Sequence, residues 1–148
     1  MSKILTSHQI PGAVIDLIEE TKEFCFLITP YYKPWNLLER ALEKAANLEK
    51  KIVFIFRARD SLTNEMKLLN EKFGFDVVMV ENLHTKLYMN ERKVILSSMN
   101  LYDSSKENNY ELGYILEGKR QAQEFKEKII GGDILCVSGN VKMEHLAW

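Results

Sequence analysis

The stretch EFCFLITPYYKPWNLLERALEKAANLEKKIVFIF, residues 23–56, decides the fold. Its two apolar runs, 23–29 and 51–56, are short and rich in Phe and Ile, which is typical of buried strands. Between them, residues 35–49 carry apolar side chains at helical spacing, and Pro34 is suited to the first position of that helix. The stretch therefore predicts a strand, a crossover helix and a second strand parallel to the first.

Similar signals continue on both sides of this unit. An amphipathic helix is predicted at 11–22, and a helix at 62–73 would be capped by Ser61 and ended by Gly74. The remaining predicted elements are strands at 75–80, 83–89, 93–98, 112–116 and 134–137 and a charged helix at 119–130. The predicted fold class is α/β: one mixed, mostly parallel β-sheet flanked by helices on both faces, in a single domain over residues 1–148.

Bulk composition restricts the classes of function. With 148 residues, 46% of them hydrophobic, the chain is the size of one domain that buries its own core, and its net charge of -1 excludes a broadly basic surface. No run is apolar enough for a secretory signal or a membrane span, so we expect a cytoplasmic protein without stable membrane association. Cys25 and Cys136 lack metal-site or redox spacing and are interpreted as reduced core residues.

Polar residues that can carry chemistry gather in the second half of the chain, in His84-Thr85-Lys86, Ser98-Met99-Asn100 and Glu111. Alternate side chains of a strand share a face, so His84 with Lys86, and Ser98 with Asn100, would each point one way. The connection at 90–92 is short enough for a hairpin. If an odd number of residues forms the turn, the four side chains lie on one face.

Such a group suits attack on a phosphodiester. Imidazole is nucleophilic at neutral pH, and Lys86 and Asn100 can donate to the non-bridging oxygens, so neither a metal nor another cofactor is required. A lone histidine, however, leaves the departing oxygen without a proton donor. Because the chain has no second copy of the cluster, we expect a twofold homodimer to supply the second histidine.

These residues resemble a known signature. His84-x-Lys86 followed by x4 and Glu91, then Ser98-x-Asn100 and the Glu111 of NNYELGYIL, are similar to the HxKx4D and GSxN motifs of the phospholipase D superfamily. The resemblance extends through LITPYYKPWNLLERALEKAANLEKKIVFIFR and covers roughly residues 10–130. A short chain with one motif is similar to the dimeric bacterial endonucleases of the superfamily and to their mitochondrial-surface relatives.

The resemblance implies a role for each motif residue. His84 would be the nucleophile in one subunit and the general acid in the other, while Lys86 and Asn100 hold the phosphoryl oxygens. Ser98 would support that network, and Glu111 would hydrogen-bond the histidine and fix its tautomer. The sequence departs from the family pattern at two places, with Glu91 in place of Asp and Ser97 in place of the Gly of GSxN.

Further side chains are candidates for substrate binding. Tyr31 and Tyr32 either stack bases beside the site or fill the base of a loop. Arg57 and Arg59 follow a strand at its carboxyl end, where α/β sheets bind ligands, and could contact phosphate.

Three functions remain open. The first is a nuclease acting on DNA or RNA. The second is a phospholipase, which the absence of a basic amphipathic helix makes less favoured. The third is a nucleic-acid-binding module that has lost turnover.

Overall fold

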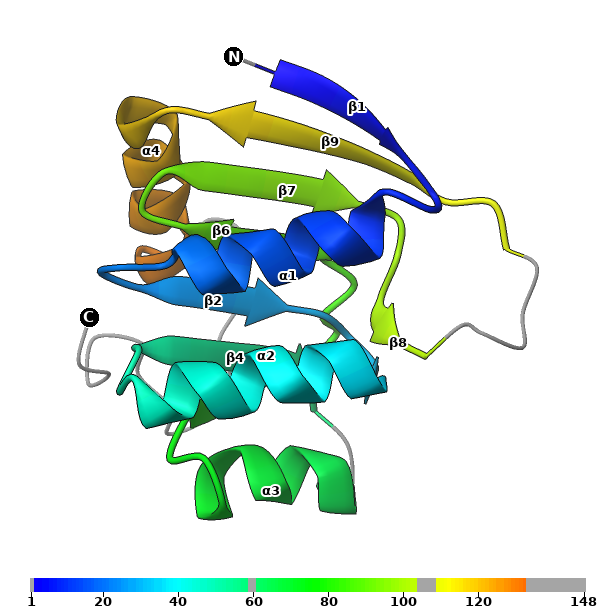
Figure 1. The fold of residues 1–148 in the computed structure, drawn as a ribbon, viewed down its shortest axis with the longest axis vertical. Helices are drawn as coiled ribbons and strands as arrows, with labels where there is room; N and C mark the ends of the chain where they lie inside the picture. The colour runs from blue at the N-terminus through cyan, green and yellow to red at the C-terminus, as the bar shows by residue number, and fades with distance from the viewer. Residues whose placement is uncertain (1, 59–60, 104–108, 133–148) are drawn as a thin grey trace.

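The computed structural model describes residues 2–58, 61–103 and 109–132, and its centre is a seven-stranded sheet (Figure 1). Figure 1 shows α1, α2 and α3 on the near face and α4 behind the sheet. The helices are α1 (Ile10–Glu20), α2 (Asn36–Asn47), α3 (Asn64–Glu71) and α4 (Lys119–Ile130). The strands are β1 (Ser2–Thr6), β2 (Cys25–Ile28), β3 (Tyr32–Lys33), β4 (Ile52–Arg57), β5 (Asp76–Val80), β6 (Leu87–Asn90), β7 (Lys93–Ser97), β8 (Leu101–Tyr102) and β9 (Leu112–Glu117).

The large sheet has the strand order β1-β9-β7-β6-β2-β4-β5, and β3 and β8 form a separate parallel pair. Strands β2, β4 and β5 pair in parallel, and the other four pairings are antiparallel. Two strands that are each antiparallel to the strand between them run in the same direction. Five strands therefore point the same way: β1, β7, β2, β4 and β5. The predicted mixed sheet with helices on both faces is confirmed.

Two layers of apolar side chains hold the sheet between its helices. Alternate residues of a strand face opposite sides, so Leu27 joins the layer under α1 and α2, whereas Phe26 and Ile28 join the layer facing α4. All three are fully buried. Strand β2 is therefore apolar on both faces, which explains its continuous apolar run in the sequence.

The strand–helix–strand prediction for residues 23–56 is confirmed, since β2, α2 and β4 follow in that order with parallel strands. Strands β1, β3 and β8 were not predicted. Two of them have only two residues each, and β1 lies at the sheet edge with an exposed Ile4, so no alternating apolar pattern marks it. The predicted strand at 134–137 and Cys136 lie outside the described residues.

The predicted start of the third helix was wrong by two residues. Helix α3 begins at Asn64, and Thr63, not Ser61, caps it by accepting a hydrogen bond from the Met66 N–H at 3.2 Å. Its end also differs by two residues, since α3 ends at Glu71 rather than Phe73, but Gly74 adopts a φ of 73° beyond it, as expected of a residue that ends a helix.

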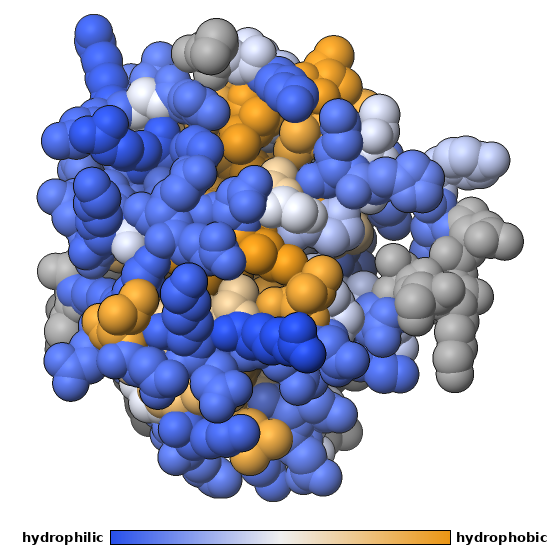
Figure 2. Space-filling model, in the orientation of Figure 1, coloured by the Kyte–Doolittle hydropathy of each residue, from blue (hydrophilic) through white to orange (hydrophobic). Residues whose placement is uncertain are grey.

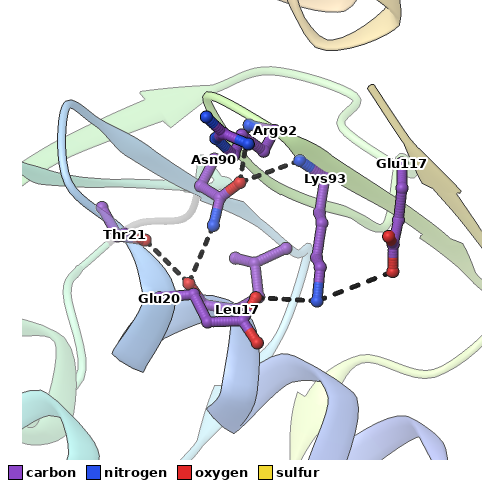
Figure 3. Close-up of polar contacts among 7 residues, drawn as sticks. All are labelled: Leu17, Glu20, Thr21, Asn90, Arg92, Lys93 and Glu117. Carbon is purple, nitrogen blue, oxygen red and sulfur yellow. Dashed lines mark hydrogen bonds and ion pairs between the residues drawn. The ribbon is translucent and has the colours of Figure 1, made fainter. Parts of the chain in front are cut away.

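A buried amide fixes the turn between β6 and β7 (Figure 3). The Oδ1 atom of Asn90 accepts from the N–H groups of Arg92 and Lys93, both at 2.8 Å, and its Nδ2 donates to the Leu17 carbonyl at 3.0 Å. Asn90 is 1% exposed, so these bonds are shielded from water. The turn is thereby tied to the last turns of α1, which fixes the register of the hairpin.

Two charged residues beside this turn also stabilise it. Lys93, the first residue of β7, contacts Glu20 at 2.7 Å and Glu117 at 3.7 Å (Figure 3). The hydrogen bond and ion pair with Glu20 raise the pKa of Lys93 above its ordinary value. Glu91 is 8% exposed, and its Oε1 accepts from the Lys22 and Glu23 N–H groups at 2.5 and 2.9 Å. It therefore anchors the loop that leads into β2.

The near face is not fully covered by helices. Figure 2 shows apolar surface between β1 and α1, over β9, among mostly hydrophilic side chains. A hollow of about 380 Å³ lies there, with Leu5, Ala13 and Ile115 among its lining residues. No helix in the described part of the chain combines the length and the apolar character that a bilayer crossing needs.

Candidate functional site

One edge of the sheet, on the right in Figure 1, collects the polar residues that the sequence singled out. Strands β2, β4, β5 and β7 end there and β6 and β9 begin there, as the pairing of Ile28 with Leu87 and of Ser97 with Gly113 requires. His84 and Lys86 lead into β6, Ser98 and Asn100 follow β7, and Glu111 precedes β9. Loops at strand ends, set by a rigid sheet, therefore carry the candidate site.

His84 and Lys86 do not lie on a strand, contrary to the prediction. Strand β6 begins at Leu87, and the segment before it is irregular, with Asn82 at a φ of 57°. The Lys86 side chain folds back along its own loop, and its Nζ donates to the His84 carbonyl at 3.1 Å. His84 is exposed, and among the described residues no hydrogen bond or ion pair holds its imidazole. The Lys86 ammonium therefore lies against the backbone of His84 at this edge of the sheet.

The hairpin turn has two residues, 91 and 92, rather than the odd number that one shared face would need. Leu87 pairs with Leu96, and the Ser97 N–H donates to the Lys86 carbonyl at 3.2 Å. A regular ladder continued in this register would place Thr85, not His84, opposite Ser98. Both segments leave the ladder at this edge, so the position of each side chain is set by its own loop.

Ser98 and Glu111 form one polar cluster with Ser7, which comes from near the start of the chain. The Ser98 hydroxyl hydrogen-bonds the Glu111 carboxylate, and the Leu112 N–H donates to Ser98 Oγ at 3.0 Å. The Glu111 N–H donates to Ser7 Oγ at 2.6 Å. The sequence predicted a bond from Glu111 to the histidine. In the single chain, the carboxylate binds Ser98 instead.

Asn100 belongs to a second, more buried group around Thr29. The Thr29 hydroxyl donates to the Tyr31 carbonyl at 2.8 Å, accepts from the Leu101 N–H at 3.1 Å, and lies 3.3 Å from Asn100 Oδ1. Below it, the hydroxyl of Tyr88 donates to the Met99 carbonyl at 2.6 Å. Burial raises the pKa of Tyr88 above its ordinary value, so this phenol stays protonated and keeps donating.

Sequence reasoning missed Ser7, Thr29 and the structural role of Tyr88. Thr29 carried a usable signal, because it is the polar residue that ends a buried apolar strand. Ser7 carried none, since it is 104 positions from Glu111 in the chain.

The four predicted substrate-binding residues have four different outcomes. Arg57 is half-buried at the end of β4, and its Nη1 donates to the Leu83 carbonyl at 3.4 Å, so it supports the loop that carries His84. Arg59 lies outside the described residues. Tyr31 is 41% exposed, whereas Tyr32 is 6% exposed, with ring centroids 5.6 and 5.2 Å from those of Phe54 and Phe56. Its buried ring makes Tyr32 a core residue, a position that does not support base stacking.

The two departures from the family pattern have local explanations. The hydroxyl of Ser97 accepts from the Met99 N–H at 2.8 Å, which stabilises the turn that carries Ser98 and Asn100. Its partner across the strands is Gly113, which has no side chain to compete for space. Glu91 lies at the opposite end of β6, where its bonds are structural.

Together, the residues at this edge offer an exposed imidazole beside hydrogen-bond donors. An ammonium, a hydroxyl and an amide can each donate to an anionic oxygen. Within the described ranges, no group of three or more His, Cys, Asp or Glu side chains could hold a metal ion.

Solved structures with the same fold support this placement of the elements. NucT from Helicobacter pylori matches with a TM-score of 0.78 at 15% identity, covering 94% of this chain and 99% of that one. Nuc from Salmonella typhimurium, described as a phospholipase D family member, matches with a TM-score of 0.69 at 15% identity over 86% and 90% of the two chains. TrmBL2, described as an archaeal chromatin protein with a novel mode of DNA binding, matches with a TM-score of 0.64 at 16% identity, covering 86% of this chain and 51% of that one.

No curated protein matches. Residues 14–131 match the profile described as "Cardiolipin synthase, PLD-like domain", which spans most of the chain and all five candidate catalytic residues. By its sequence and its fold, this chain belongs to the family of phospholipase-D-like (PLD-like) domains.

Proposed function

We propose that the protein is a metal-independent phosphodiesterase, and specifically a nuclease, that acts through a covalent phosphohistidine in a homodimer. One observation carries this proposal. An exposed imidazole lies at a sheet edge that also presents an ammonium, a hydroxyl, an amide and a carboxylate, on His84, Lys86, Ser98, Asn100 and Glu111. This set of groups fits nucleophilic attack on phosphorus with stabilisation of the charged oxygens.

The reaction has two steps. In the first, the imidazole nitrogen of His84 attacks phosphorus, the bond to the leaving oxygen breaks, and His84 of the second chain gives that oxygen a proton. In the second, water attacks phosphorus, its proton passes to the second chain's histidine, and the phosphorus–nitrogen bond breaks. Lys86 and Asn100 donate to the non-bridging oxygens throughout. Glu111 acts through Ser98, which it holds in place.

Homodimer formation is supported by apolar side chains exposed next to the site. Ile4 and Leu112 are 65% and 63% exposed and Tyr114 is 39% exposed. Ile4 pairs with Tyr114, and Leu112 directly follows Glu111. Alternation places all three on the face opposite α1, because Leu5 and Ile115 point to the α1 side. A surface of this kind suits contact with a second copy, and we call these three residues the self-association patch.

Nucleic acid is the proposed substrate, with Tyr31 and Arg57 as candidates for contact with it, and Arg59, outside the described residues, as a candidate from the sequence alone. The fold likeness to a DNA-binding chromatin protein favours it over phospholipid. That likeness also favours one alternative function, a DNA-binding module without turnover.

Replacement of His84 tests the proposal. Wild-type protein in a chelator should cut single- or double-stranded DNA or RNA, and His84→Ala should lower the rate by about a thousandfold or more, because it removes both nucleophile and acid. Since His84 is exposed, the variant should unfold at the wild-type temperature. Acid-quenched reactions should show a phosphoryl adduct on His84 by mass spectrometry.

The other outcomes choose between the alternatives. If wild-type protein binds DNA but cuts no polynucleotide, the alternative function, a DNA-binding module without turnover, is supported. Release of a head group from phospholipid, with DNA and RNA intact, would make it a phospholipase. Full cleavage by His84→Ala would refute the mechanism.

A further inference from the structure

A hollow of about 200 Å³ lies beyond the ends of the strands, next to the candidate site but separate from the residues proposed for catalysis. One side is formed by Tyr31, Lys33 and Tyr102, and the other by Thr63 and Glu65 at the start of α3. Aromatic rings with one ammonium are the features that single-strand-binding proteins use to hold bases and backbone.

The β3–β8 pair builds the aromatic side of this hollow. Tyr32 pairs with Leu101 and Lys33 with Tyr102, and the first pair is buried in the core. Alternation along each two-residue strand therefore turns Lys33 and Tyr102 outward. Tyr102 is 38% exposed, and the Asp103 N–H donates to the Lys33 carbonyl at 2.7 Å. The ring is thus held on fixed backbone, and little ordering would be needed on binding.

Thr29 connects the hollow to the candidate site. Its hydroxyl donates to the Tyr31 carbonyl at 2.8 Å and lies 3.3 Å from Asn100 Oδ1. The same hydroxyl therefore contacts both Tyr31, which lines the hollow, and Asn100, which is proposed to bind phosphate. Tyr102 follows Asn100 by two residues, which in extended chain spans about 7 Å. A group bound against Tyr102 would therefore lie close to a phosphate bound at Asn100.

The charges of Lys33 and Glu65 favour one orientation of a nucleotide bound in the hollow. The Nζ of Lys33 lies over one face of the Tyr102 ring, 5.7 Å from its centroid, where its charge would attract a backbone phosphate and leave the other face for a base. Glu65 on the other wall would repel a phosphate but can accept a hydrogen bond from a base. The arrangement favours a nucleotide whose base enters the hollow and whose phosphate stays near Lys33.

We propose that this hollow is a subsite for one unpaired nucleobase beside the scissile phosphate, so that the preferred substrate is single-stranded nucleic acid. A base inside a duplex has both faces stacked and cannot enter without being extruded. The subsite rests on the proposed phosphodiesterase function, and its test must distinguish the two.

The test compares Tyr102→Ala with Tyr102→Phe, which keeps the ring. Cleavage is measured in chelator on a single-stranded oligonucleotide, on the same sequence as a duplex, and on a strand whose sugars all lack bases. We expect Tyr102→Ala to raise KM for the single strand roughly tenfold or more with little change in kcat, because stacking on one base is lost. Tyr102→Phe should stay within about twofold of wild type.

On the duplex and the base-free strand, Tyr102→Ala should equal wild type. Equal KM values for the Ala and Phe variants on the single strand would overturn the subsite, and so would an equal loss on all three substrates. If Tyr102→Ala fails to fold, Tyr31→Ala and Tyr31→Phe serve as the pair.

Failure of the proposed function would look different. If wild-type protein cuts no phosphodiester, fluorescence anisotropy with the labelled single strand still measures binding. Weaker binding by roughly tenfold in Tyr102→Ala, but not in Tyr102→Phe, would then support the subsite alone. Identical binding by both variants would overturn it.

Discussion

At the residue scale, two buried polar groups show how burial decides chemical behaviour. Cys25 is fully buried at the start of β2, and loss of hydration raises the pKa of its thiol from 9.0 to about 12. In Glu91, one side-chain oxygen accepts from two backbone N–H groups, and the other is buried without a hydrogen-bond partner among the described residues. Neither group is placed for catalysis, since both lie toward the end of the sheet opposite the candidate site.

The Cys25 thiol predicts a specific dependence of stability on pH. Between about pH 9 and 12, the folded protein keeps the thiol proton while the unfolded chain releases it, so the free energy of unfolding falls as pH rises. This contribution is fully present below pH 9. Cys25→Ala lacks this pH-dependent contribution. The substitution also leaves a small cavity, which lowers the free energy of unfolding by about 1 kcal/mol at pH 7.

The stability advantage of wild type over Cys25→Ala should therefore fall by about 1 kcal/mol or more on going from pH 8 to pH 10, which removes or reverses it. Urea unfolding at pH 7, 8, 9 and 10 measures it. A difference that stays constant over this range would mean that the thiol titrates normally in the folded state.

At the element scale, helix α3 shows the limit of reading caps from sequence. Ser61 and Thr63 are both residues that can cap a helix, and the apolar Leu62 favoured the earlier start. The structure uses Thr63, whose hydroxyl reaches the Met66 N–H, and starts the helix at Asn64. Packing decides between the two, because Met66 and Leu69 are buried against the sheet layer under the helices.

Removing the observed cap should have a measurable cost. Thr63→Ala should lower the free energy of unfolding by about 1 kcal/mol, because one N–H at the start of α3 loses its partner. Thr63→Ser keeps the hydroxyl and should stay close to wild type, and Ser61→Ala should change little. Chemical denaturation of the three variants measures these differences. Equal losses in Thr63→Ala and Ser61→Ala would contradict the assigned cap.

At the scale of the whole molecule, the candidate site depends on contacts between distant parts of the chain. Ser7 meets Glu111 across 104 positions, and Thr29 meets Asn100 across 71. The proposed reaction adds a second chain, since each histidine needs a partner to protonate the leaving oxygen. Oligomeric state and activity should therefore change together.

A charge placed in the self-association patch tests this coupling. Ile4→Asp should convert the dimer to a monomer and reduce phosphodiesterase activity in parallel, because a carboxylate cannot be buried unpaired in an apolar contact. Leu48→Asp, with 61% exposure at the end of α2 against 65% for Ile4, is the matched control and should change neither property.

Analytical ultracentrifugation at several concentrations measures the oligomeric state of both variants. A dimer that survives Ile4→Asp would remove the patch from the interface. Full activity in a monomeric variant would refute the two-chain mechanism.

The sequence alone determined the local features of this protein. Apolar runs marked β2 and β4, helical spacing marked α2, and the pattern of His84, Lys86, Ser98 and Asn100 indicated the PLD-like family, because each signal depends on neighbours within a few residues. The predicted face-sharing of these side chains failed, because it assumed regular strands through 83–89 and 93–98.

Only the tertiary structure decided how the candidate site is assembled. The bond from Asn90 to α1 fixes a two-residue turn. The functional side chains lie outside the paired strands, on the loop that precedes β6 and on the loop that follows β7. Tyr31 and Tyr32 are identical neighbours in the sequence, yet one faces solvent and the other packs on Phe54 and Phe56. Such outcomes depend on side chains that meet only after the sheet has formed, and local sequence pattern does not encode those contacts.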